Sequence, residues 1–177
     1  MLVSCAAGHK NSDKINLTVH AEERTGKASL KRRTSEDPGA KMKKIETSMR
    51  TVDSIVKSNF LEGPFGIKID TEGAEIEVIL GARQTLESCT FVIAEVSVSD
   101  RFENGCKFSD IISMMKKNGF EMVDVLSYQF QPRFLDCLFL PRKEASFLKK
   151  KISNSNSAEI DTSMCISVPR FLREHAL

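Results

Sequence analysis

The stretch that decides the fold runs Gly66-Ile67-Lys68-Ile69-Asp70-Thr71-Glu72-Gly73-Ala74-Glu75. Phe65 to Ile69 is apolar apart from one lysine, which predicts a short buried strand. Asp70 ends this strand, and from Gly73 onward the apolar residues take helical spacing. A strand that ends on a carboxylate and leads at once into a helix is a βα corner. In open α/β sheets, ligands bind at such corners, at the carboxyl ends of the strands.

Length and composition are those of one globular domain, with 177 residues, 41% hydrophobic and 28% charged. A net charge of +2, no tryptophan and a single tyrosine argue against a nucleic-acid surface with stacked bases. The five cysteines are scattered and form no Cys-x-x-Cys pair, which argues against a disulfide framework or a metal site and favours a reducing compartment. No apolar run approaches the roughly 20 residues that span a bilayer. We therefore expect a cytoplasmic protein without membrane or nucleic-acid partners.

The first half carries weaker signals. Leu2 to Gly8 predicts a buried strand, and the alternation in Ile15 to Val19 predicts a half-exposed strand. A turn at Arg24 to Lys27 leads to a second arm at Ala28 to Leu30. The charged residues 31–46 predict a solvated insertion loop, although their basic clusters also suit a nuclear import signal, and Arg32-Arg33-Thr34-Ser35 suits a basophilic kinase.

After the corner the pattern alternates regularly. Before the corner, residues 51–56 predict a strand end and a short helix capped by Asp53 or Ser54. Apolar residues between Ile76 and Leu86 share one helical face, and Gly81 within it indicates close packing. The sequence then predicts a buried strand at 91–98, a helix at 108–117, and strands at 120–128 and 134–140. The last two strands are joined too closely for a crossover helix, so we expect them to be antiparallel.

These elements predict an α/β fold with an incomplete doubly wound sheet, mostly parallel and ending in an antiparallel hairpin. The predicted domain spans residues 1–143, and residues 144–177 form a polar, loosely ordered tail.

The corner also resembles a known family. Its run from Lys68 to Glu75, followed by Val78-Ile79-Leu80-Gly81-Ala82, is similar to the signature of the FkbM-type methyltransferases. Weaker likenesses extend the resemblance over residues 51–141. The resemblance implies a Rossmann-like class I methyltransferase fold and S-adenosylmethionine as methyl donor. It also implies O-methylation of a hydroxyl on a sugar or small natural product.

In that family the corner at Asp70 would follow the fourth strand and face the cofactor, and Leu2 to Gly8 would be the third strand. The resemblance therefore implies cofactor contacts from Asp70, with Ala6 and Ala7 near the adenine. The family's Gly-rich loop and ribose-binding acid have no counterpart before Asp70. We therefore expect a chain that starts inside its domain, with a bare sheet edge that favours self-association.

Three carboxylates are the candidate catalytic residues: Asp70, Glu72 and Glu95. From the residues alone, acids in the first turn of a helix only complement its positive end, by about 0.3–1 kcal/mol each. The resemblance favours Asp70 and Glu72 as site residues, because carboxylates suit a ligand that carries an ammonium and a sulfonium. Glu95, in an apolar strand, must be paired or reach the sheet edge. There it is either a substrate-orienting residue or a general base.

The sequence therefore predicts a methyltransferase that acts on a small hydroxyl compound. A second hypothesis is a non-catalytic remnant that serves as an interaction or structural module. A weaker third is a nuclear or nucleic-acid-linked protein, based on the cluster from Lys31 to Lys44. His9, Asp124 and Asp136 are expected to be solvated or structural rather than catalytic.

Overall fold

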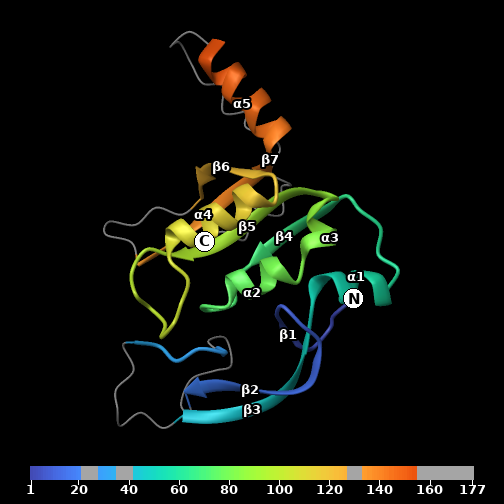
Figure 1. Ribbon diagram of the computed structural model, residues 1–177, viewed down its shortest axis with the longest axis vertical. Coiled ribbons are helices and arrows are strands. Elements are labelled where there is room, and N and C mark those ends of the chain that lie inside the picture. Colours follow the sequence, from blue (N-terminus) through green and yellow to red (C-terminus); the bar gives the residue numbers. More distant parts are fainter. Residues whose placement is uncertain (21–27, 35–41, 127–132, 155–177) are drawn as a thin grey trace.

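A computed structural model describes residues 1–20, 28–34, 42–126 and 133–154, which form two sheets and five helices (Figure 1). Within these residues no helix is both long and apolar enough to cross a membrane. The elements are β1 (Ala6–Ala7), β2 (Ser12–His20), β3 (Met42–Arg50), α1 (Val52–Ser58), β4 (Phe65–Ile69), α2 (Glu75–Leu80), α3 (Arg83–Leu86), β5 (Cys89–Ser97), α4 (Phe108–Lys117), β6 (Phe120–Val125), β7 (Phe134–Pro141) and α5 (Arg142–Asn154).

The larger sheet has four strands in the order β4-β5-β7-β6. β4 and β5 are parallel, because the helices α2 and α3 carry the chain back between them. β7 lies antiparallel to both β5 and β6, so the expected antiparallel pairing of the last two strands is confirmed. The register sets Ile69 beside Ala94 and Glu95 beside Asp136.

The core lies on one face of this sheet, against α2 and α4. Val92 and Phe139 of the sheet and Ile79 and Ile111 of the helices are completely buried there. On the opposite face, Ala145 at the start of α5 is buried against Ile93, Leu138 and Leu140. Leu148 also packs against this cluster, and the last turns of α5 extend beyond the end of the sheet (Figure 1).

The smaller sheet has three strands in the order β1-β3-β2. β3 lies at its centre, parallel to β1 and antiparallel to β2. Its charged residues, Lys43, Lys44 and Glu46, are exposed, whereas Met49 at its end is buried. Residues 42–46, which the sequence assigned to a charged insertion loop, are therefore the first half of a strand.

The predicted fold class was wrong. The strands that the structure describes do not form one doubly wound, mostly parallel sheet, but two mixed sheets with one parallel pair in each. The physical reason is the strand Met42–Arg50, which pairs with Ala6–Ala7 and holds them in the smaller sheet. In the larger sheet β7 lies between β5 and β6, so among the described strands β4 and β5 are the only parallel pair of this sheet.

Helix α1 differs from its prediction in its cap. Thr51 caps it, since the Thr51 hydroxyl accepts the backbone N–H of Ser54 at 3.0 Å. The Asp53 carboxylate instead accepts the backbone N–H groups of Gln84 and Thr85 at 3.1 and 2.8 Å. Asp53 thus ties α1 to the start of α3.

Gly81 ends α2, and the expectation of close packing there is confirmed. A Cβ atom on Gly81 would lie 2.1 Å from the carbonyl oxygen of Gly8. The contact brings the loop after β1 against the end of α2. Only a residue without a side chain permits this approach.

We predict that Gly81→Ala lowers the free energy of unfolding in urea by about 1–3 kcal/mol, because the added methyl must displace backbone atoms. Ser113→Ala, on the exposed side of α4, is the matched control and should leave the unfolding curve unchanged. A Gly81→Ala variant as stable as the wild type would contradict the close approach of the two segments.

Candidate active site

The corner after β4 is a tight backbone turn. Glu72 and Gly73 both have positive φ angles, 53° and 103°. Two features require glycine at position 73. One is the positive φ angle, and the other is space, since a Cβ atom there would lie 2.7 Å from the ring of Phe102. Glu72, which has a side chain, is held in a conformation that L-residues seldom adopt, and such residues cluster at functional sites.

Glu75 closes the corner from inside. It is almost fully buried, and its Oε1 accepts the backbone N–H of Gly73 at 2.9 Å and the hydroxyl of Thr71 at 3.3 Å. The thiol of Cys106 donates to Oε2 at 3.4 Å. Burial, with the adjacent Glu75 carboxylate, raises the pKa of the Cys106 thiol to about 12, so the thiol stays protonated and acts as a donor. Glu75 is therefore a structural residue of the corner.

Arg101 joins the two predicted glutamates. Its Nη1 lies 2.6 Å from Oε1 of Glu95, and its Nη2 lies 3.0 Å from Oε2 of Glu72. The three side chains are only 8%, 14% and 15% exposed, in the order Arg101, Glu95, Glu72. One buried cation thus fixes a strand carboxylate and a corner carboxylate in a single geometry.

A second arginine reaches the same corner. Arg33 Nη2 lies 2.7 Å from Oε2 of Glu72. The two guanidinium groups lie 5.1 and 5.2 Å from the centre of the Phe102 ring, and Arg101 also lies 4.5 Å from that of Phe134. Aromatic faces attract such cations. Glu72 is therefore neutralised from two sides within an aromatic enclosure.

Arg33 belongs to a strap, residues 29–34, that lies over the corner. The hydroxyl of Ser29 donates to the carbonyl of Glu72 at 2.6 Å, and Lys31 Nζ lies 2.9 Å from Glu77 Oε1. The backbone of Ser29 also pairs with Thr18 of β2. The strap therefore links the smaller sheet to the corner of the larger one, rather than standing in solvent as the charge pattern suggested.

Asp70 has a different environment. Its carboxylate is 42% exposed and lies 3.3 Å from Nζ of Lys68. Because Ile69 pairs with Ala94, Asp70 lies beside Glu95, and the carboxylate of Asp70 contributes to raising the Glu95 pKa. The structure thus brings together all three predicted carboxylates. Asp70 is the one that none of the described arginines engages.

Ala6 and Ala7 lie elsewhere, in the smaller sheet, where they pair with Met49 and Arg50. Both are half-buried, and Ala7 packs against the main core. Within the described residues no strand pairing joins them to Asp70. Their role at the adenine stays a prediction.

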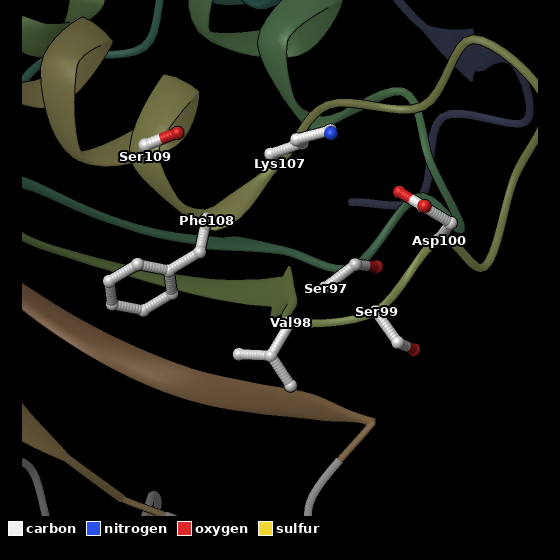
Figure 2. A pocket seen from close by; sticks show the side chains of 7 residues that line it. All are labelled: Ser97, Val98, Ser99, Asp100, Lys107, Phe108 and Ser109. Carbon is white, nitrogen blue, oxygen red and sulfur yellow. The ribbon is translucent and has the colours of Figure 1, made fainter.

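A cleft opens at the end of β5 (Figure 2). It has a volume of about 430 Å³ and lies between the loop after β5 and the start of α4. The lining residues are Ser97, Val98, Ser99, Asp100, Lys107, Phe108 and Ser109. Arg101 directly follows this loop in the sequence, but neither Arg101 nor any of the three predicted carboxylates is among the lining residues.

The model of the methyltransferase FkbM domain family matches residues 2–122, more than half of the chain. The chain belongs to this family. No curated protein and no solved structure matches the chain. The methyltransferase match contains the corner, both predicted alanines, Glu95 and the cleft, and it begins earlier than the resemblance that the sequence motifs indicated.

The sequence did not identify Arg101 or Arg33 as parts of this candidate site. Arg101 is 29 residues from Glu72, and Arg33 lies in a charged stretch of ordinary composition. A signal was present only in Glu95, because a lone carboxylate in an apolar strand requires a cation somewhere in the fold.

We predict that Arg101→Met lowers the free energy of unfolding by about 3–5 kcal/mol, because two buried carboxylates lose their shared cation. Adding Glu95→Gln to this variant should restore part of the loss, since one stranded charge is removed. Urea denaturation of both variants measures this. A loss below about 1 kcal/mol, as for a surface ion pair, would contradict the arrangement.

A pH dependence follows from Glu95. Burial raises its pKa above the usual value of 4.5, although the hydrogen bond from Arg101 opposes the rise. A carboxyl with a raised folded-state pKa contributes stability at low pH that is lost as the pH rises through that pKa.

We predict that the unfolding free energy of the wild type falls relative to that of Glu95→Gln as the pH rises from 4.5. Urea titrations at a series of pH values on both proteins measure the difference. A difference that grows with pH would show that Arg101, rather than burial, controls this carboxyl.

Proposed function

We propose that this protein is an S-adenosylmethionine-dependent methyltransferase that methylates a hydroxyl oxygen of a small molecule. The observation that carries the proposal is the environment of Asp70. Of the three carboxylates gathered at the ends of β4 and β5, it is the exposed one. Family membership supports the methyltransferase class, and the position at a βα corner supports a ligand there.

The charges at this edge fit the cofactor. S-adenosylmethionine carries a sulfonium and an ammonium, and it supplies an electrophilic methyl group. Asp70 can hold a cationic group of this ligand, because its nearest described partner is the exposed Lys68 at 3.3 Å. Glu72 and Glu95 are less suited to this role, since arginines already occupy them. Ala6 and Ala7 are the proposed contacts to the adenine, because their short apolar side chains leave room for the adenine ring.

Glu95 and Glu72 then take different roles. Glu95 is the proposed general base or orienting group for the acceptor hydroxyl, because burial raises its pKa and favours proton uptake. Glu72, fixed by two arginines, holds the corner in the conformation that presents Asp70. Methyl transfer needs close, in-line placement of the two reactants, which a rigid corner supports.

We predict that isothermal titration shows binding of S-adenosylmethionine, and that Asp70→Asn weakens it about tenfold, because a negative charge close to the cationic groups of the ligand is removed. Glu87→Gln, on an exposed residue after α3, is the matched control and should bind like the wild type. Absence of binding to the wild type would contradict the proposed cofactor. Equal affinities of wild type and Asp70→Asn would remove Asp70 from the site.

A second candidate is a non-catalytic interaction module. Two of the three carboxylates, Glu72 and Glu95, already pair with arginine side chains, and β4 has a strand neighbour on one side only among the described residues. An unpaired strand edge favours pairing with a second copy. Size-exclusion chromatography with light scattering distinguishes the two, since a monomer that binds the cofactor would contradict the module.

A further inference from the structure

Two opposite charges at the cleft have no side-chain partner among the residues that the structure describes. The ammonium of Lys107, at the start of α4, and the carboxylate of Asp100, in the loop after β5, extend toward one another in Figure 2. Neither forms a side-chain hydrogen bond or ion pair with any described residue. Exposed ions of opposite sign in one cleft that remain unpaired are available to a ligand.

The loop holds Asp100 in place without using its side chain. Val98 N–H donates to the carbonyl of Arg133 at 3.0 Å, and Arg101 N–H donates to that of Ser99 at 2.8 Å. From the strap, Thr34 N–H donates to the carbonyl of Arg101 at 2.9 Å. The backbone on both sides of Asp100 is therefore fixed, and its carboxylate is presented to the cleft.

Lys107 is fixed in the same way. Its backbone N–H donates to Oδ2 of Asp110 at 2.9 Å, which closes the first turn of α4. The side chain takes no part in this cap. Both charged groups thus stand on anchored backbone, as preorganised binding groups do.

The remaining lining suits a small organic ligand. Ser97, Ser99 and Ser109 contribute hydroxyl groups, and Val98 and Phe108 contribute apolar surface. A volume of about 430 Å³ is in the range of small-molecule sites. A ligand with a single charge would be attracted by one of Lys107 and Asp100 and repelled by the other. A ligand with both a positive and a negative charge can pair with both side chains.

We propose that this cleft binds an α-amino-acid headgroup, with its carboxylate at Lys107 and its ammonium at Asp100. This proposal rests on the proposed function, because two ligands of that reaction can supply the headgroup. One source is the amino-acid end of the methyl donor. The other is a methyl acceptor that is itself a hydroxylated amino acid.

Titration calorimetry with matched ligands separates these sources. S-adenosylhomocysteine and methylthioadenosine differ in the amino-acid end alone. L-tyrosine, tyramine and 3-(4-hydroxyphenyl)propanoate share a phenol. L-tyrosine carries both an ammonium and a carboxylate, tyramine carries only the ammonium, and the propanoate carries only the carboxylate. Each is titrated into wild type, Asp100→Asn, Lys107→Met and the control Lys117→Met, which changes an exposed lysine at the far end of α4.

If the donor supplies the headgroup, both cleft variants weaken S-adenosylhomocysteine about three- to tenfold and leave methylthioadenosine unchanged. If the acceptor supplies it, they weaken L-tyrosine by a similar factor, and its two singly charged analogues bind the wild type less tightly than L-tyrosine does. Lys117→Met should match the wild type throughout. Either pattern supports the cleft as a headgroup site.

The proposal is overturned if the cleft variants bind S-adenosylhomocysteine as the wild type does and L-tyrosine either fails to bind or is unaffected. The cofactor assignment survives that outcome. If neither nucleoside binds the wild type, the proposed function fails, and the L-tyrosine series still decides whether the cleft takes an amino acid.

Discussion

The guanidinium of Arg101 is the interaction on which the functional end of this protein depends. The Arg101 side chain is only 8% exposed, and it bonds Glu72 of the corner and Glu95 of β5 at the same time. Removing such groups from water costs several kcal/mol per ion. The attraction between the ions offsets this cost only where the geometry is good and every charge has a partner. Here the two acids, two arginines and two phenylalanine rings supply that match. The turn at Glu72, the end of β5 and the loop after β5 are consequently fixed relative to one another.

Charged side chains elsewhere in the fold also act as joints. Asp53 accepts two backbone N–H groups of α3. Arg33 and Lys31 of the strap pair with Glu72 of the corner and Glu77 of α2. Because β1 and β4 belong to different sheets, the two sheets are connected by such contacts, by the approach of Gly8 to Gly81 and by the packing of Ala7 against the main core. Hydrogen bonds and ion pairs from the strap, rather than pairing between strands of the two sheets, hold the corner against the smaller sheet.

The same pairing divides the acids by chemistry. Glu72 and Glu95 are matched inside the protein, whereas Asp70 at the sheet edge and Asp100 in the cleft are exposed to incoming ligands. Of the two exposed acids, Asp70 belongs to the corner after β4 and Asp100 to the loop after β5. A cationic ligand would meet them on approaching this end of the sheet.

The sequence by itself determined the local elements and the corner. Phe65 to Ile69, the apolar run of β5, the helical spacing of α4 and the last antiparallel pair were predicted from periodicity, because side-chain burial repeats at the period of the element. The motif from Lys68 to Glu75 also identified the family. These features depend on neighbours a few residues away, so the sequence contains them directly.

The tertiary structure decided the sheets and the electrostatics. β3 was missed because its exposed lysines resemble those of a solvated loop, and only its partners on both sides make it a strand. Arg101 bonds one acid 6 residues away and another 29 away, and Arg33 reaches the second from another segment of the chain. A sequence shows which charges exist, but their partners are set by where strands pair and by which carboxylates folding removes from water.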